Sequence, residues 1–308
     1  MSAIIKRVPV PFAGVMLGFA ALGNLLQSYS EVIRLACGIL SAFCLLLLLL
    51  KIIMYPSMIA EDLKNPVMAS VSSTFPMGLM LLSTYVKPII GQAAMYFWFF
   101  SIALMVILVL YFTKTFIMNL QIPKVFASYF IVYSGIAVAS VTAPAFEQQT
   151  VGNICFWLAF AGWVAMFILV TYRYMNFKEI PPMLQPLICI YTAPLSLCVA
   201  GYVQSGAPKM LPFLLVIYGI SAALYVFSLV KAVGYLKLPF FPSYAAFTFP
   251  FVISAIASKM TMAFTTKAGA PIPGMDIIVL IQTVIATLFM LYAFYRFMQS
   301  ILSTPKAA

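Results

Sequence analysis

The chain has 308 residues, of which 65% are apolar and only 7% are charged, and its formal net charge is +11. A soluble globular domain is about a quarter charged, so this composition excludes a soluble enzyme or binding domain and indicates a membrane protein. The basic residues are scattered singly at the ends of apolar segments, which argues against nucleic acid as a partner.

Apolar segments of membrane-spanning length follow one another along the whole chain. A transmembrane helix needs about 20 mostly apolar residues and satisfies its own backbone groups in lipid, so each segment predicts a helix. The expected spans are residues 8–28, 31–54, 65–86, 93–117, 123–144, 151–174, 183–204, 211–233, 240–264 and 275–300. Residues 1–308 are therefore expected to form a single transmembrane domain of an all-α polytopic membrane protein, with ten helices paired as five hairpins.

The basic residues also predict the orientation in the membrane, because cytoplasmic loops are enriched in Lys and Arg. If the N-terminus is cytoplasmic, twelve basic residues face the cytoplasm: Lys6, Arg7, Lys51, Lys64, Lys114, Lys124, Arg173, Lys178, Lys231, Lys237, Arg296 and Lys306. Five face the other side: Arg34, Lys87, Lys209, Lys259 and Lys267. We therefore expect a multi-pass protein of the cytoplasmic (inner or plasma) membrane with both termini in the cytoplasm. The first apolar segment is of spanning length and no clear cleavage site follows it, so we interpret it as a retained span rather than a secretory signal.

Helix-breaking residues recur in the odd-numbered spans. Pro76, Pro194 and Pro250 lie near the middle of spans three, seven and nine, and Gly18 and Gly135 lie at the matching depth of spans one and five, 56 to 59 residues apart. The even-numbered spans have no proline in their interiors. Because a mid-helix proline removes a backbone hydrogen bond and kinks the helix, the pattern predicts an inner ring of five kinked helices around a central pore. The alternative is that Gly and Pro are simply common in membrane helices.

A threonine lies two residues before each of these prolines. Thr74, Thr192 and Thr248 can bond a backbone carbonyl that the proline leaves free, or can help to replace the hydration shell of an ion. We favour the backbone bond. Together with the five breakers, these threonines are the candidate pore-lining and kink residues.

The polar inventory favours anions as the transported species. The six acidic residues all lie away from the centre of the expected spans, and the chain has no histidine, which argues against proton coupling and against a cation pathway. Arg34 and Lys259 lie near the outer ends of spans two and nine and can attract anions there; the alternative is that both extend to the membrane interface. With no histidine, nucleotide-binding motif or carboxylate pair, we expect neither an enzyme nor a metal or other cofactor.

Four short motifs resemble those of a known family. They are Pro11-Phe12-Ala13-Gly14, Asn65-Pro66-Val67 with Ser73-Thr74-Phe75-Pro76-Met77, Tyr191-Thr192-Ala193-Pro194 through Ala200-Gly201-Tyr202, and Ala246-Phe247-Thr248-Phe249-Pro250. In their order and spacing they resemble spans one, three, seven and nine of the tellurite-resistance/dicarboxylate transporter family, which includes bacterial TehA proteins and plant slow-type anion channels. The resemblance covers essentially the whole chain.

The resemblance implies a homotrimer in which each protomer has its own pore, closed by a phenylalanine on span nine. The residue that matches is Phe249, although the chain has 27 phenylalanines and Phe247 and Phe251 lie close by. We expect an anion channel or channel-like uniporter for small inorganic anions such as chloride and nitrate, with membrane lipid and small anions as its partners. The alternatives are a secondary carrier that exports a C4-dicarboxylate, sulfite or another oxyanion, and a membrane scaffold without transport. The periodic breakers argue against the scaffold.

Overall fold

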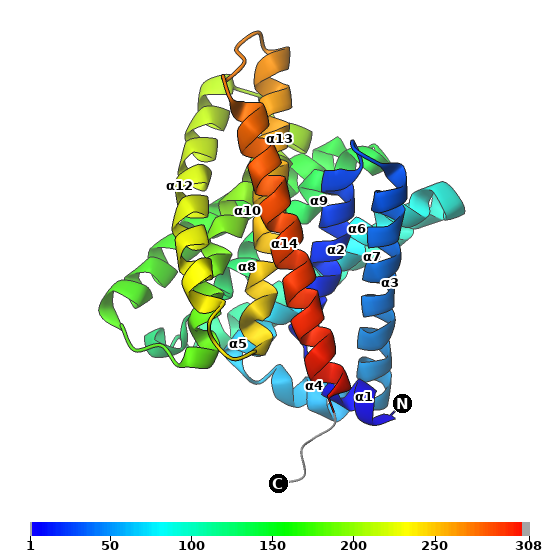
Figure 1. Ribbon diagram of the computed structural model, residues 1–308, viewed down its shortest axis with the longest axis vertical. Coiled ribbons are helices and arrows are strands. Elements are labelled where there is room, and N and C mark those ends of the chain that lie inside the picture. The colour runs from blue at the N-terminus through cyan, green and yellow to red at the C-terminus, as the bar shows by residue number, and fades with distance from the viewer. Residues whose placement is uncertain (1, 304–308) are drawn as a thin grey trace.

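The computed structural model describes residues 2–303, apart from the side chain of Ala3; Lys306, which we expected in the cytoplasm, lies outside the described residues. The elements of the described part are all helices. The first, α1 (Ser2–Arg7), and the C-terminal end of the last, α14 (Met275–Leu302), lie at one end of the molecule, where the Arg7 side chain donates a hydrogen bond to the carbonyl of Ser303 (Figure 1). The short helix α4 (Pro56–Asp62) lies at the same end. We call this end the termini side and the opposite end the far side.

Within residues 2–303, eight helical stretches are long and apolar enough to cross a membrane. They are α3 (Glu31–Met54), α5 and α6 (Pro66–Ser72, Thr74–Ile90), α7 and the π-helix η1 (Ala93–Phe112, Thr113–Ile117), α10 (Gln149–Asn176), the 3₁₀-helix η4 and α11 (Pro182–Tyr191, Thr192–Ser205), α12 (Leu211–Tyr235), the 3₁₀-helix η5 and α13 (Pro242–Phe247, Phe249–Lys267), and α14. They correspond to eight of the ten expected spans and confirm an all-α polytopic membrane protein.

The expected count of ten is not confirmed, because the first and fifth spans are shorter than a full crossing. The segment 8–28 contains α2 (Phe12–Leu26), which begins only after two prolines, and proline lacks the N–H that a helix interior needs. The segment 123–144 is divided into short pieces. These are η2 (Ile122–Lys124), α8 (Tyr129–Ser134), α9 (Ala137–Thr142) and η3 (Ala143–Phe146).

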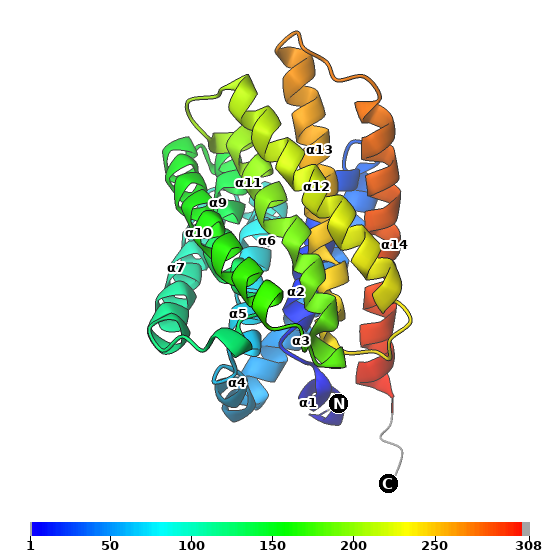
Figure 2. The same cartoon turned by 90° about the vertical axis from the view of Figure 1, so that its left-hand side faces the viewer.

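The helices form an inner and an outer layer. The inner helices α2, α6, α9, α11 and α13 make a closed ring, since each contacts the next and α13 contacts α2. Each is paired with the helix that follows it in the chain, namely α3, α7, α10, α12 and α14. The most apolar windows of the spans that contain α6, α11 and α13 are 78%, 89% and 72% buried, whereas those of the five outer helices are 22–39% buried. Figure 2 shows α7, α10, α12 and α14 at the periphery with α2 and α6 between them. The outer helices therefore carry the apolar surface that faces lipid.

The inner spans are interrupted where the sequence has its breakers, but the prolines do not lie inside continuous helices. Pro76, Pro194 and Pro250 each lie in the first turn of a new helix, α6, α11 or α13. A missing N–H has no cost in a first turn, because no carbonyl of the same helix is available to that group. The interruption at Gly135 separates α8 from α9. In contrast, α2 runs unbroken through Gly18, where an added Cβ would lie 2.7 Å from the Met290 sulfur, so this glycine serves close packing against α14.

Candidate functional site

Two cavities lie inside the inner ring. The termini-side cavity has a volume of about 110 Å³ and is lined by residues of all five inner spans, among them Gly14, Thr74, Ser134, Pro194 and Pro250. The far-side cavity has a volume of about 460 Å³ and is lined by residues of α2, α3, α6, α9, α11 and α13, by Gln27 after α2, and by Pro144 and Ala145 of η3. Of the residues that the structure describes, only Leu197 and Phe249 line both cavities, so these two side chains form the partition between them.

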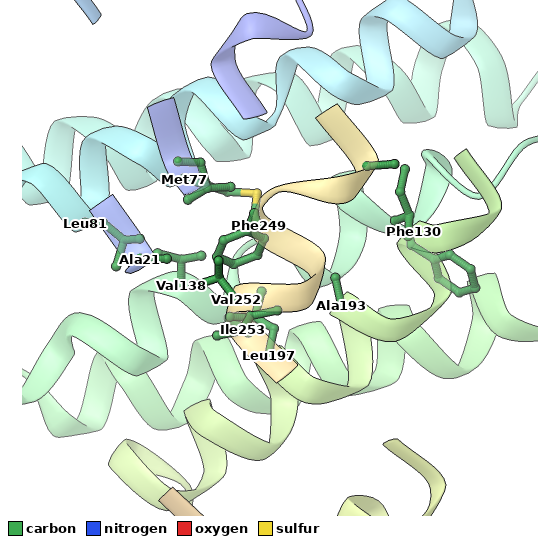
Figure 3. Packing of buried hydrophobic residues seen from close by; sticks show 14 of the residues in the cluster. Ala21, Met77, Leu81, Phe130, Val138, Ala193, Leu197, Phe249, Val252 and Ile253 are labelled. Carbon is green, nitrogen blue, oxygen red and sulfur yellow. The ribbon is translucent and has the colours of Figure 1, made fainter. Parts of the chain in front are cut away.

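Phe249 is placed at the partition by its position at the start of α13. The residue before it, Thr248, has an irregular backbone (φ −90°, ψ −103°) that ends the 3₁₀-helix η5 and turns the chain into α13. Figure 3 shows the Phe249 ring among the side chains of Met77, Leu197 and Ile253, which belong to three of the inner helices. The ring is 5% exposed, and its surroundings are apolar.

The neighbouring phenylalanines point elsewhere. The Phe247 ring lies 4.9 Å from that of Tyr244, and the Phe251 ring lies 4.7 Å from that of Phe289 on α14 and 5.8 Å from that of Tyr225 on α12. Neither Phe247 nor Phe251 lines a cavity. Of these three phenylalanines, only Phe249 therefore faces the inside of the ring.

The three threonines bond to protein atoms. The Thr248 hydroxyl lies 2.7 Å from the Ala245 carbonyl and 2.9 Å from the Gly14 carbonyl, and it ties the start of α13 to α2. The Thr74 hydroxyl donates to the Val71 carbonyl (2.7 Å), and Thr192 shares a hydrogen bond with Ser254 (2.7 Å). Of the three, only Thr74 lines a cavity.

The breakers lie at the level of the termini-side cavity but do not all line it. Pro194 and Pro250 do, whereas Gly18, Pro76 and Gly135 line neither cavity. Their near neighbours on the inside of the ring are Gly14, Met77 and Ser134. Leu197, which the sequence analysis missed, lies three residues after Pro194, and helical residues three apart share a face, so this spacing was the signal that could have identified it.

Arg34 lines the far-side cavity and is held by three neighbours. Its guanidinium donates to Glu31 Oε1 (2.6 Å) and to Asn24 Oδ1 (3.4 Å), and lies 4.6 Å from the centroid of the Tyr85 ring. The Tyr85 hydroxyl donates to the Ala20 carbonyl (2.7 Å).

Two glycines make room for the Tyr85 ring. A Cβ added at Gly23 would lie 2.2 Å from the Tyr85 hydroxyl oxygen, and one added at Gly38 would lie 2.7 Å from its ring. Replacing either glycine would therefore displace the ring on which Arg34 rests.

Lys259 lines the same cavity without an acidic partner. Its ammonium group donates to the Leu25 carbonyl (2.8 Å) and to Ser28 Oγ (2.5 Å), and no carboxylate within the described range forms an ion pair with it. Among the described residues, no Asp or Glu lines either cavity. The far-side cavity therefore carries net positive charge, while the termini-side cavity has no charged side chain in its lining.

The family of the chain follows from a comparison with family models. The model described as voltage-dependent anion channel matches residues 7–298. The chain belongs to this family. The match confirms the resemblance carried by the four motifs and assigns the chain to a family of membrane anion channels and transporters. A search among curated proteins finds no match.

Proposed function

We propose that this protein is an anion channel or channel-like uniporter through which small inorganic anions such as chloride and nitrate cross the cytoplasmic membrane. The observation that carries the proposal is the pair of cavities inside the inner ring, separated only by Phe249 and Leu197. Family membership supports anions as the class of substrate. The resemblance further implies a homotrimer with one pathway in each protomer, and the distribution of Lys and Arg favours cytoplasmic termini.

In this proposal Phe249 is the gate. A large apolar ring in a narrow apolar passage excludes water, and a passage without water cannot carry a hydrated ion. Opening requires the ring to move away from Leu197, either by a change of its rotamer or by a shift of the first turn of α13. The irregular backbone at Thr248 separates η5 from α13. The first turn of α13 can therefore shift at this point without breaking a continuous helix.

Charge and polarity account for selectivity. Arg34 and Lys259 raise the electrostatic potential of the far-side cavity, which concentrates anions and repels cations. On the termini side the hydroxyls of Thr74 and Ser134 are already bonded to carbonyls (Ser134 at 2.6 Å from that of Phe130), and only the buried hydroxyl of Ser243 in this lining has no partner among the described residues. The cavity therefore replaces little of an anion's hydration shell. Anions that lose water easily are therefore favoured, with nitrate ahead of chloride.

The absence of carboxylates and histidine from the described lining favours uniport over proton coupling. The chain has no histidine, and within the described residues no carboxylate lines either cavity. Proton relays in carriers are built from Asp, Glu and His side chains. A carrier of a dicarboxylate, sulfite or another oxyanion that uses a different driving force is the alternative.

The test is to record chloride and nitrate currents from purified wild-type protein and from Phe249→Ala. We expect large anion currents in the variant and small ones in the wild type. Phe251→Ala is the matched control, because it removes another buried ring from the same helix on the side that packs against Phe289. Size-exclusion chromatography verifies that both variants stay folded. If all proteins are silent while labelled anion still moves slowly and saturably, the carrier replaces the channel.

A further inference from the structure

A polar groove lies on the termini side of the molecule, beside the inner ring. Its volume is about 570 Å³. Three segments line it: residues 61–67 at the junction of α4 and α5, residues 123–126, and residues 173–184 from the end of α10 into η4. Val67 and Leu184 line both this groove and the termini-side cavity. The groove and the cavity therefore share a wall that consists of two side chains.

Arg173 holds two of these segments together. Its guanidinium donates to the carbonyls of Pro123 (3.2 Å), Phe177 (3.1 Å) and Glu179 (3.5 Å), and lies 4.3 Å from the centroid of the Phe126 ring. The side chain is buried, its Nε has no hydrogen-bond partner, and no described carboxylate pairs with it. Arg173 therefore both shapes the groove and leaves a positive charge beside it.

The other charges of the groove do not cancel this one. Glu61 and Lys64 neutralise each other in an ion pair of 2.7 Å. Of the remaining charged side chains in the lining, Lys124 and Arg173 are basic and Glu179 is acidic. The groove is thus net positive, and it borders a cavity that has no charge of its own.

We propose that this groove is the entrance by which anions from the termini side reach the central cavity, with Lys124 raising and Glu179 lowering the rate at which they enter. This inference rests on the proposed transport of anions. Anions that reach the apolar cavity from water need a nearby positive potential to raise their local concentration, and the groove supplies it. Val67 and Leu184 are then the side chains that an entering anion passes.

The charges can be tested in the Phe249→Ala background at about 0.1 M salt, where only charges within about 10 Å are felt. We expect Lys124→Gln to lower, and Glu179→Gln to raise, the current of anions entering from the termini side by about twofold each. Both effects should vanish at about 1 M salt, where the screening length is about 3 Å. Lys237→Gln is the control, because Lys237 is exposed in the connection between α12 and η5 but lines neither the groove nor the cavity. Unchanged currents in both groove variants, or an equal decrease in Lys237→Gln, would overturn the proposal in favour of an axial entrance.

A chemical test reverses the sign at a single position. All five native cysteines are buried, so a cysteine placed at 124 is the accessible thiol of the described chain. In one sample, modification of Lys124→Cys from the termini side with a negatively charged thiol reagent should lower the labelled-chloride flux. In a separate sample, modification with a positively charged reagent should bring the flux back to the level of the parent protein, because it replaces the charge of Lys124. Equal fluxes after both reagents would contradict the inference. Because the flux assay also works for a slow carrier, a failure of the channel proposal and a failure of this inference remain distinguishable.

Discussion

The two halves of the central pathway differ in charge and in size, although the same five inner spans line both. The far-side half is wide and carries Arg34 and Lys259, whereas the termini-side half is about a quarter as large and is lined almost wholly by apolar groups. The difference follows from the residues that line each half. The far-side half reaches Arg34 in the first turn of α3 and Lys259 within α13, whereas the uncharged lining of the termini-side half runs from the starts of the spans, at Pro11 and Val67, inward to Pro250. We propose that the far-side half attracts anions and that the termini-side half removes part of their hydration shell. Phe249 separates the two halves.

The largest expected effect comes from joining the two halves at the second residue of the partition. Leu197→Ala removes a side chain that lines both cavities but leaves the Phe249 ring in place. We expect an anion current roughly tenfold smaller than that of Phe249→Ala. In the double variant the increase in current should be smaller than the product of the two single increases, because the effects of neighbouring residues are not additive. Currents from the two single variants and the double variant check this. A purely multiplicative double variant would mean that the two residues do not share one constriction.

A smaller effect should come from removing charge on the far side alone. Lys259 has no acidic partner, so Lys259→Gln should lower the chloride current entering from the far side by about threefold at low salt. The current entering from the termini side should change little, because that cavity has no charged side chain. Conductance measured with salt varied on one face at a time checks this asymmetry. An equal loss in both directions would show that the two halves do not act separately.

Arg34 should contribute less, because Glu31 partly neutralises it. Arg34→Gln is expected to lower the far-side current by less than twofold, while Glu31→Gln should raise it by a similar factor. The opposite signs are the critical result. Decreases in both variants would indicate that the ion pair serves only the structure of α3.

The last prediction concerns the residue that positions Arg34, whose replacement should have an effect no larger than that of Arg34→Gln. Tyr85→Phe keeps the ring beneath the guanidinium and loses only the bond to Ala20, whereas Tyr85→Leu loses the stacking as well. We expect Tyr85→Leu to reproduce the conductance of Arg34→Gln and Tyr85→Phe to stay close to wild type. Single-channel conductance at low and high salt distinguishes an electrostatic from a structural effect. A loss of conductance that persists at high salt would be structural, because salt screens the electrostatic effect.

The sequence predicted the layers of the fold better than the details of the lining. Hydropathy and the periodic breakers led to the inner and outer rings, and the motif match led to Phe249. Hydropathy alone could not separate helix from 3₁₀-helix and loop, so residues 123–144 were predicted as one span although they form several short pieces.

Which side chains face the pathway depends on the rotation of each helix, and the sequence does not fix that rotation. Pro76 was expected on the inside, yet Met77, one residue later and about 100° around the helix, lines the cavity. The groove forms where three segments that are far apart in the chain lie side by side, which the sequence does not reveal. In the sequence, Arg173 contributed only to the predicted orientation of the protein in the membrane.

The most direct test of the central claim is the reversal potential of Phe249→Ala under a tenfold gradient of potassium chloride. If Phe249 closes a pathway whose charges select anions, the current should reverse near the chloride equilibrium potential, about 59 mV from zero. A reversal near zero, or near the potassium potential of opposite sign, would contradict an anion-selective pathway.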